Sequence, residues 1–203
     1  NTIHADGLGS RNYGIYAYRA DYNALNNNTI TAKGVDFNFG MLIYNSSFTE
    51  IHSNYISAYG TSVRNFGILL DIDSRASNVS GNTIIANGTS SDNYGIYIIL
   101  TANNTVVSNN ITTNGTGENN GIVIDTSSFN NISFNNISAS GGERSMGIYF
   151  YYTAQNNTVM RNAISTLGLN SDAVYFNASG IEYPGFNNFT NNFTKYVWTS
   201  FLC

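Results

Sequence analysis

Cysteine, proline and charge are all scarce in this 203-residue chain, which has one cysteine, one proline and 10% charged residues. A single cysteine excludes a fold held together by intrachain disulfides. It also indicates a location outside the cytosol, because a reducing compartment tolerates several free thiols and an oxidising one removes them. For Cys203 itself we expect a terminal thiol without a role, with an intermolecular disulfide as the alternative.

Basic residues are scarce as well, since Lys and Arg number 8 and the net charge is −4. A nucleic-acid partner calls for a basic face, which these scattered residues do not make. No apolar run reaches the length of a membrane span, so we expect no membrane insertion in this segment. Histidine, cysteine and methionine do not cluster, and His4 and His52 fall in different repeats, so we expect no metal and no cofactor.

What the chain has in abundance is a repeated motif, Asn-x-Ile-x-(Ala/Thr)-x-Gly. Successive copies start 27, 26, 28, 27, 26 and 27 residues apart. A period in this range predicts a solenoid or another repeat architecture. The seven copies start at Asn1, Asn28, Asn54, Asn82, Asn109, Asn135 and Asn162.

Each period also carries a second segment that opens on Gly or Ala, such as Gly67-Ile-Leu-Leu, and a third apolar position, such as Val79. These segments are short and rich in β-branched and aromatic residues, and Gly or Asn marks each corner. No stretch shows a helical period with caps. Three strands per period close one coil of a parallel β-helix, in which each strand pairs with its equivalent one coil away.

We therefore predict an all-β chain of about seven coils, each of 26–28 residues, with an uninterrupted core from Ile3 to Ile164. The β-helix is expected over residues 1–180. Residues 181–203 should form a degenerate last coil and an aromatic cap or docking tail that includes Trp198. The recurring Asn is expected to form a hydrogen-bonded ladder along the axis, since stacked amides pair in this way.

One outward face of the second strand is unusually aromatic. A β-helix core needs only the inward residues, so this face calls for an explanation. It can contact a partner protein or another copy of the chain, it can stack a surface polysaccharide, or its rings can satisfy one another. The aromatic residues predicted for this face are Tyr16, Tyr18, Tyr44, Tyr97, Tyr149, Tyr151 and Tyr175.

The same face holds the best candidates for catalysis, Asp71 and Asp125, with Asp73 and Arg75 nearby. Two coils separate Asp71 from Asp125, roughly 9–10 Å, which is the upper limit for two glycosidase carboxylates. Apolar residues lie between them, and no basic residue other than Arg75 is expected nearby. We expect that the chain is not an enzyme, and keep a polysaccharide lyase or hydrolase as an alternative.

Asparagine also forms thirteen Asn-x-Ser/Thr sequons, and several lie at corners or point outward, where a glycan is sterically possible. We expect surface N-glycosylation. The candidate residues are Asn27, Asn45, Asn78, Asn87, Asn103, Asn110, Asn114, Asn131, Asn136, Asn156, Asn177, Asn188 and Asn192.

Segments such as Asn130-Asn-Ile-Ser-Phe-Asn-Asn-Ile137 resemble the right-handed parallel β-helix repeats of NosD-like surface proteins. The resemblance covers nearly all of the chain and implies a right-handed β-helix in a secreted, glycan-bearing surface module. The copper-linked role of NosD itself does not fit, because copper-binding residues do not cluster.

Because the first motif starts at Asn1, we expect coils or a cap upstream, and copies that stack end to end into a sheath, filament or surface layer. The alternative is a monomeric adhesin or carbohydrate-binding module that uses the tyrosine face.

Overall fold

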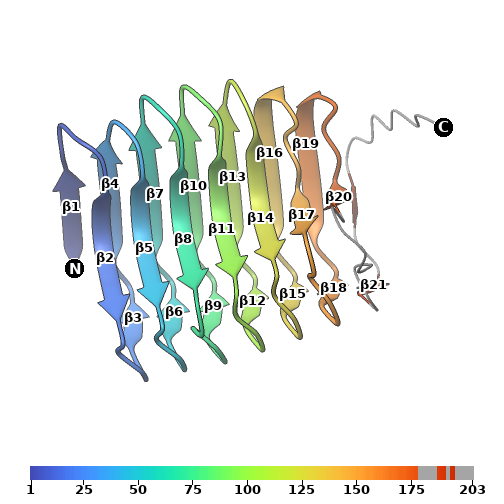
Figure 1. The fold of residues 1–203 in the computed structure, drawn as a ribbon, viewed down its shortest axis with the longest axis horizontal. Helices are drawn as coiled ribbons and strands as arrows, with labels where there is room; N and C mark the ends of the chain where they lie inside the picture. The colour runs from blue at the N-terminus through green and yellow to red at the C-terminus, as the bar shows by residue number, and fades with distance from the viewer. Residues whose placement is uncertain (178–186, 191–192, 195–203) are drawn as a thin grey trace.

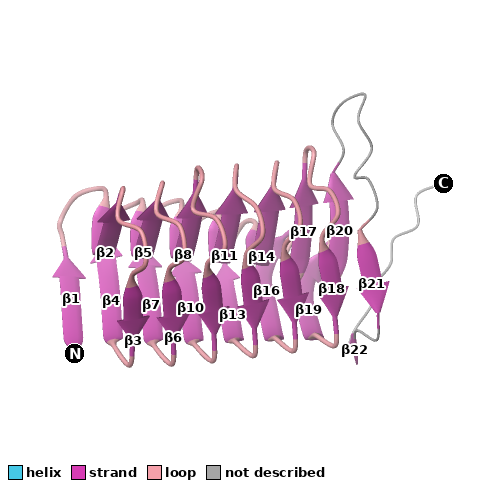
Figure 2. Ribbon diagram, turned by 90° about the horizontal axis from the view of Figure 1, so that it is seen from below, coloured by secondary structure: helices cyan, strands magenta, loops and turns pink. Residues whose placement is uncertain are grey.

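A computed structural model describes residues 1–177, 187–190 and 193–194, which wind into a rod of parallel strands (Figure 1). Three sheets run along the rod, and each coil adds one strand to each sheet (Figure 2). Sheet A contains β1 (Thr2–Asp6), β4 (Thr29–Gly34), β7 (Tyr55–Gly60), β10 (Thr83–Gly88), β13 (Asn110–Gly115), β16 (Asn136–Glu143), β19 (Ala163–Leu169) and β22 (Phe193–Thr194).

Sheet B follows sheet A in every coil, and its first five strands have seven residues each. It contains β2 (Asn12–Tyr18), β5 (Asn38–Tyr44), β8 (Asn65–Asp71), β11 (Asn93–Ile99), β14 (Asn119–Asp125), β17 (Ile148–Tyr151) and β20 (Val174–Asn177).

Sheet C closes the coil with short strands. It contains β3 (Ala24–Asn26), β6 (Glu50–His52), β9 (Asn78–Ser80), β12 (Thr105–Val107), β15 (Asn131–Ser133), β18 (Thr158–Met160) and β21 (Asn188–Thr190). The prediction of an all-β parallel β-helix with three strands per coil is confirmed. In the described part of the chain no helix is long and apolar enough to cross a membrane.

The core follows from the alternation of each strand. In sheet A the motif isoleucines stack in register, as Ile56, Ile84 and Ile111 do in β7, β10 and β13, and all three are fully buried. Burying each such side chain contributes about 1.5–3 kcal/mol. The column runs without interruption to Ile164, with Ile3 packed against its first member, which confirms the predicted core.

Buried asparagines hold the corner between sheets C and A. The Nδ2 of Asn54 donates to the Oδ1 of Asn82 at 3.0 Å, and that of Asn82 donates to Asn109 at 2.9 Å. The backbone N–H of each also donates to the next Oδ1, so one side chain satisfies two donors of the preceding coil. The predicted ladder is present, and a second one runs through Asn38, Asn65 and Asn93 at the entry to sheet B.

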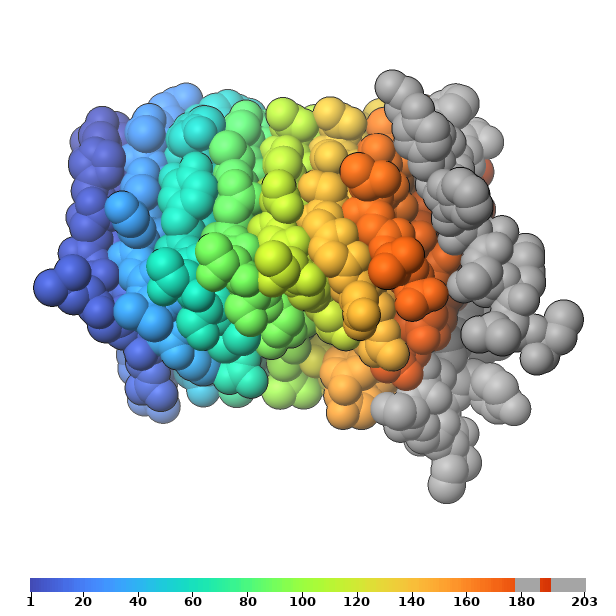
Figure 3. All heavy atoms as spheres, turned by 90° about the horizontal axis from the view of Figure 1, so that it is seen from above, coloured from blue at the N-terminus to red at the C-terminus, as the bar shows by residue number. Residues whose placement is uncertain are grey.

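Each coil contacts only the coils beside it. Figure 3 shows the coils as successive bands along the long axis, and every pairing joins strands of adjacent coils. Strands β21 and β22 continue sheets C and A beyond residue 180. Trp198, Cys203 and Asn192 lie outside the described residues, so the predictions made for them stay predictions.

Candidate functional site

The outward face of sheet B has the columns that the sequence predicts. One column pairs Tyr16 with Leu42 and continues through Leu69 and Tyr97, and the next pairs Tyr18 with Tyr44 and continues to Asp71. Tyr16 and Tyr18 are about half exposed, and their rings lie 6.0 Å apart. The predicted tyrosines therefore share one face of sheet B but form separate groups. Tyr16, Tyr18 and Tyr44 pack together in coils 1 and 2, and Tyr149, Tyr151 and Tyr175 pack together at the other end of the sheet.

A third aromatic column lies beside these two and explains why some outward residues are buried. It consists of four residues that each directly precede a glycine in a strand of sheet B, namely Tyr13, Phe39, Phe66 and Tyr94. The rings of Phe66 and Tyr94 stack at 5.0 Å. Together these rings cover the outward-facing Leu42 and Leu69, which form a small second core. Mutual packing of the rings thus accounts for the middle of the face.

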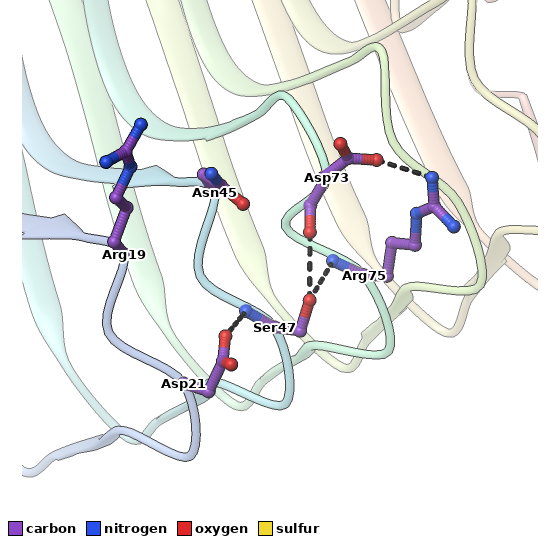
Figure 4. A pocket seen from close by; sticks show the side chains of 6 residues that line it. All are labelled: Arg19, Asp21, Asn45, Ser47, Asp73 and Arg75. Carbon is purple, nitrogen blue, oxygen red and sulfur yellow. Dashed lines mark hydrogen bonds and ion pairs between the residues drawn. The ribbon is translucent and has the colours of Figure 1, made fainter.

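A groove lies where sheet B turns into sheet C in coils 1–3 (Figure 4). Its volume is about 440 Å³, and two residues from each of the three turns line it. The lining residues are Arg19, Asp21, Asn45, Ser47, Asp73 and Arg75.

Hydrogen bonds fix one wall of the groove. The Asp21 carboxylate accepts from the backbone N–H of Ser47 at 2.7 Å, and the Ser47 hydroxyl donates to the backbone carbonyl of Asp73 at 2.8 Å. Arg75 forms an ion pair with Asp73. Asp21, Ser47 and Asp73 are therefore held across three coils, and the charges of Asp73 and Arg75 offset each other.

Arg19 and Asn45 form the other wall and keep their polar groups available. The Arg19 guanidinium lies over the Tyr18 ring, 5.1 Å from its centre, and within the described chain it meets no carboxylate. Figure 4 shows Asn45 between Arg19 and Asp73, and its side-chain amide makes no hydrogen bond to the described residues. The groove thus offers an uncommitted cation and an uncommitted amide beside an aromatic ring.

An extra residue in the third turn shapes the groove. Tyr44 and Asp71 are register partners 27 residues apart, whereas the backbone N–H of Ser46 reaches the hydroxyl of Ser74, 28 residues away. The additional residue leaves Ile72 and Asp73 with positive φ angles of 25° and 55°. This bulge carries Asp73 outward to the groove.

Two exposed aromatic rings lie one residue beyond the groove lining. Tyr22 follows Asp21 and Phe48 follows Ser47, and their rings stack in parallel at 4.9 Å. They are 76% and 48% exposed. Both occupy left-handed corners, with φ of 59° and 56°, which costs an aromatic residue about 1–3 kcal/mol.

Equivalent corners in later coils hold Ala76, Asn103, Phe129 and Asn156. Sequence reasoning missed Tyr22 and Phe48, as well as Arg19, Asp21 and Ser47. The available signal was an aromatic residue at a corner where Asn or Gly is favoured.

Of the carboxylates proposed from the sequence, Asp73 lines the groove, Asp71 ends β8 two residues earlier, and Asp125 lies two coils further along sheet B. The Tyr97 hydroxyl donates to Asp125 at 2.7 Å, and the Thr126 hydroxyl donates to the other carboxylate oxygen of Asp125 at 2.8 Å. Asp71 accepts from the backbone N–H of Ile72, and partial burial raises the pKa of Asp71. Burial and the hydrogen bond to Asp125 raise the pKa of Tyr97. Arg75 pairs with Asp73 rather than with Asp71.

No three His, Cys, Asp or Glu side chains in the described ranges lie close enough together to hold a metal ion.

Most of the sequons lie away from the body of sheet B. The exposed asparagines are Asn27, Asn45, Asn78, Asn103, Asn110, Asn114, Asn136, Asn156 and Asn188, and the half-buried ones are Asn87, Asn131 and Asn177. Asn177, at the end of β20, donates to the Tyr149 hydroxyl. Asn45 is the sequon asparagine that lines the groove. Whether any of them carries a glycan stays a prediction.

Two solved structures share this fold, those of the periplasmic alginate epimerase AlgG and of a point mutant of that enzyme. Both align with a TM-score of 0.52 at 17% and 16% identity, and they cover 90% of this chain. The chain spans 47% of the enzyme's length, and the likeness is one of fold. A search of curated protein sequences finds no match.

These structures correct the prediction that the chain is not an enzyme. That prediction rested on the spacing and surroundings of Asp71 and Asp125, yet an enzyme that acts on alginate is built on the same β-helix. The model of the right-handed beta helix region matches residues 1–164, which is most of the chain. The chain therefore belongs to the right-handed β-helix family.

Proposed function

We propose that this chain binds a saccharide chain outside the cytoplasm, in the groove of coils 1–3 and along the adjoining tyrosines. The observation that carries the proposal is a groove of about 440 Å³ with six polar lining residues and exposed aromatic rings close by. The lining is entirely polar or charged, unlike the mostly apolar pockets that hold drug-sized ligands, so the groove suits a hydroxyl-rich ligand.

The two kinds of surface suit the two sides of a sugar ring. The faces of pyranose rings carry C–H groups that pack on aromatic rings, and the edges carry hydroxyls that hydrogen-bond to carboxylates and amides. Here Tyr18 lies beside Arg19, and Tyr22 and Phe48 follow the lining residues directly. The left-handed corner itself recurs in later coils and is a property of the repeat. What distinguishes Tyr22 and Phe48 is that their exposed rings stack on each other directly beside the lining residues.

The groove is open at the surface and crosses three coils, which favours a polymer over a small molecule. Arg19 is available to pair with acidic sugars. One carboxylate oxygen of Asp21 has no hydrogen-bond partner among the described residues and can accept from a sugar hydroxyl. We therefore expect binding to hydroxyl-rich chains, with Arg19 strengthening the binding of acidic ones.

Calorimetric titration with a panel of neutral and acidic polysaccharides tests the proposal. Replacing Tyr22 and Phe48 together by alanine should weaken binding by about tenfold, or about 1.4 kcal/mol. Phe129→Ala is the matched control, because Phe129 occupies the same left-handed corner in coil 5 and is 60% exposed. Equal affinity of the double variant and the parent, or an equal loss in the control, would refute the groove as the binding site.

Modification of the bound chain is the second candidate function. Asp71, whose pKa is raised by partial burial, follows Tyr44 in the column beside the groove. Asp125 lies two coils from Asp71 and accepts a hydrogen bond from Tyr97. The fold shared with an alginate epimerase supports this candidate. Incubation with the polysaccharides that bind, followed by analysis of chain length and sugar configuration, tests it. Turnover that survives Asp71→Asn would exclude Asp71 from the chemistry.

Assembly of copies into a surface layer, sheath or filament stays a proposal beside these two. The exposed Tyr16 and Tyr18 support a lateral contact between copies as well as a sugar contact. Electron microscopy at high protein concentration separates the possibilities, since dispersed particles that bind sugar would favour the monomeric binding module.

A further inference from the structure

The sequon at Asn45 sits inside the groove that we assign to saccharide binding. Asn45-Ser46-Ser47 fits the acceptor pattern, and both Asn45 and Ser47 line the groove. Asn45 is exposed at a left-handed corner with φ of 48°. Its Nδ2, the atom that accepts a glycan, therefore lies at the groove surface.

Three other sequon asparagines are less available to a sugar. The amide of Asn177 donates to Tyr149, the amide of Asn136 donates to Asn110 at 3.0 Å, and the side-chain oxygen of Asn131 is buried. The amide of Asn45 has no such partner in the described chain.

We propose that Asn45 is N-glycosylated and that its first sugar residues occupy the groove, so that the glycosylated chain does not take an external saccharide. This inference rests on the proposed function, because it uses the same polar lining and aromatic rings as the sugar contact. The groove is then controlled by a modification of the chain itself.

The covalent step has a defined balance. An oligosaccharide activated as a lipid-linked diphosphate is the donor, and the bond between its anomeric carbon and the diphosphate oxygen breaks. The new bond joins that carbon to the Nδ2 of Asn45. The amide loses one proton, and the diphosphate leaves with the bonding electron pair.

The position of the first sugar follows from the lining residues. Asn45 lies between Arg19 and Asp73, so a sugar on Nδ2 starts between a guanidinium and a carboxylate (Figure 4). Asn103 provides the comparison, because it is also exposed at a left-handed corner, with φ of 60°, but does not line the groove. A glycan on Asn103 should project into solvent.

The test compares the chain from a glycosylating host with the chain from a host without N-glycosylation. Peptide mass spectrometry measures occupancy at Asn45. Endoglycosidase trimming is followed on the folded chain and again after denaturation. We expect an occupied Asn45 whose glycan is trimmed at least several-fold more slowly in the folded chain, while the glycan at Asn103 is trimmed at similar rates in both. A bare Asn45, or equal trimming rates at Asn45 before and after denaturation, would overturn the inference.

Binding supplies the second readout. The unglycosylated parent should bind the polysaccharide panel about tenfold more tightly than the glycosylated parent. Asn103→Gln from the glycosylating host should bind as weakly as the glycosylated parent, because Asn103 does not line the groove. Equal affinity of the glycosylated and unglycosylated parents would overturn the inference. If the unglycosylated chain binds no saccharide, the proposed function fails, and the occupancy and trimming results still decide the state of Asn45 separately.

Discussion

Asn82 shows how much of this fold depends on single polar side chains. It is 1% exposed, and its amide donates to the carbonyl of Ile51 and to Asn109 while its oxygen accepts two bonds from Asn54. Replacing it with leucine leaves several buried donors and acceptors without partners, each at a cost of about 1–3 kcal/mol.

We therefore expect Asn82→Leu to lower the free energy of unfolding by more than about 3 kcal/mol, measured by urea denaturation. Asn110→Ala is the control, since Asn110 is exposed and, among the described residues, its side chain bonds only to the exposed Asn136. It should change stability by no more than about 0.5 kcal/mol. A similar loss of unfolding free energy in the two variants would show that the asparagine ladder stabilises the fold no more than a surface contact does.

Tyr97 makes the free energy of unfolding depend on pH. Its pKa is raised above the ordinary value of 10.0, mainly by burial and then by the bond to Asp125. Unfolded Tyr97 ionises near its ordinary pKa while the folded residue stays protonated. Above about pH 10 the unfolded state binds fewer protons, so the stabilising contribution of Tyr97 is present below this pH and is lost as pH rises.

The prediction is a fall in the free energy of unfolding above pH 10 that is less steep in Tyr97→Phe than in the parent. Urea denaturation at several pH values between 8 and 11 measures the two slopes. Parallel curves would mean that Tyr97 ionises equally in the folded and unfolded states. Such a result would also remove the support that the Tyr97–Asp125 contact gives to the second candidate function.

At the level of strands, neighbouring coils approach so closely that some positions have room only for glycine. A Cβ on Gly67 in β8 would lie 2.2 Å from the Cγ2 of Ile84 and 2.6 Å from the carbonyl oxygen of Gly95. Neither contact can be relieved without moving backbone, so glycine is needed here for space.

Gly67→Ala should therefore lower the melting temperature by more than about 8 °C or prevent folding, as followed by circular dichroism. Gly9→Ala is the matched control, because nothing lies within 4 Å of a Cβ built on Gly9. A Gly67→Ala variant that melts with the control would show that the coils can separate at this corner at little cost.

The strands also show where sequence reasoning succeeds and where it stops. The alternation of Ile30 and Ala32 places both inside, as predicted, because a period of two leaves no other arrangement. Leu42 lies on the outward face of β5, as the alternation requires, yet it is buried. The aromatic rings that directly precede the glycines of sheet B cover Leu42. Buried and exposed side chains therefore stop alternating at this point of the strand.

The groove was hidden for a related reason. Asp73 reaches the groove because the third turn contains one extra residue. The length of the repeat varies along the chain, so the sequence does not show on which side of the turn the extra residue lies. The left-handed corners of Tyr22 and Phe48 depend on backbone pairing between coils, which no local pattern specifies. Of the residues proposed for the saccharide site, Asp73 lies where the repeat departs from its own pattern.

For the molecule as a whole, the repeat makes stability close to a sum over coils and the interfaces between neighbours. The groove uses coils 1–3 alone, and sheet pairing never skips a coil. Coil 4 can therefore be deleted while the strands of the remaining coils keep their register, provided that the deletion removes one whole period. Asn82 and Asn109 are ladder neighbours 27 residues apart, so deletion of residues 83–109 joins two equivalent corners.

We expect this deletion to give a folded, shorter β-helix that binds the same saccharides as the parent with an affinity within about threefold. Thr83 and Asn110 are register partners, so β7 would pair with β13 and Ile56 would stack on Ile111. Deletion of residues 83–104 is the control, because it removes part of a period and places β12 where β10 stood, which should abolish cooperative unfolding. Circular dichroism, urea denaturation and calorimetric titration of both variants provide the comparison. Loss of folding in the whole-period variant would show that coil 4 contributes more than its neighbour contacts, and loss of binding in a folded variant would place part of the saccharide site beyond coil 3.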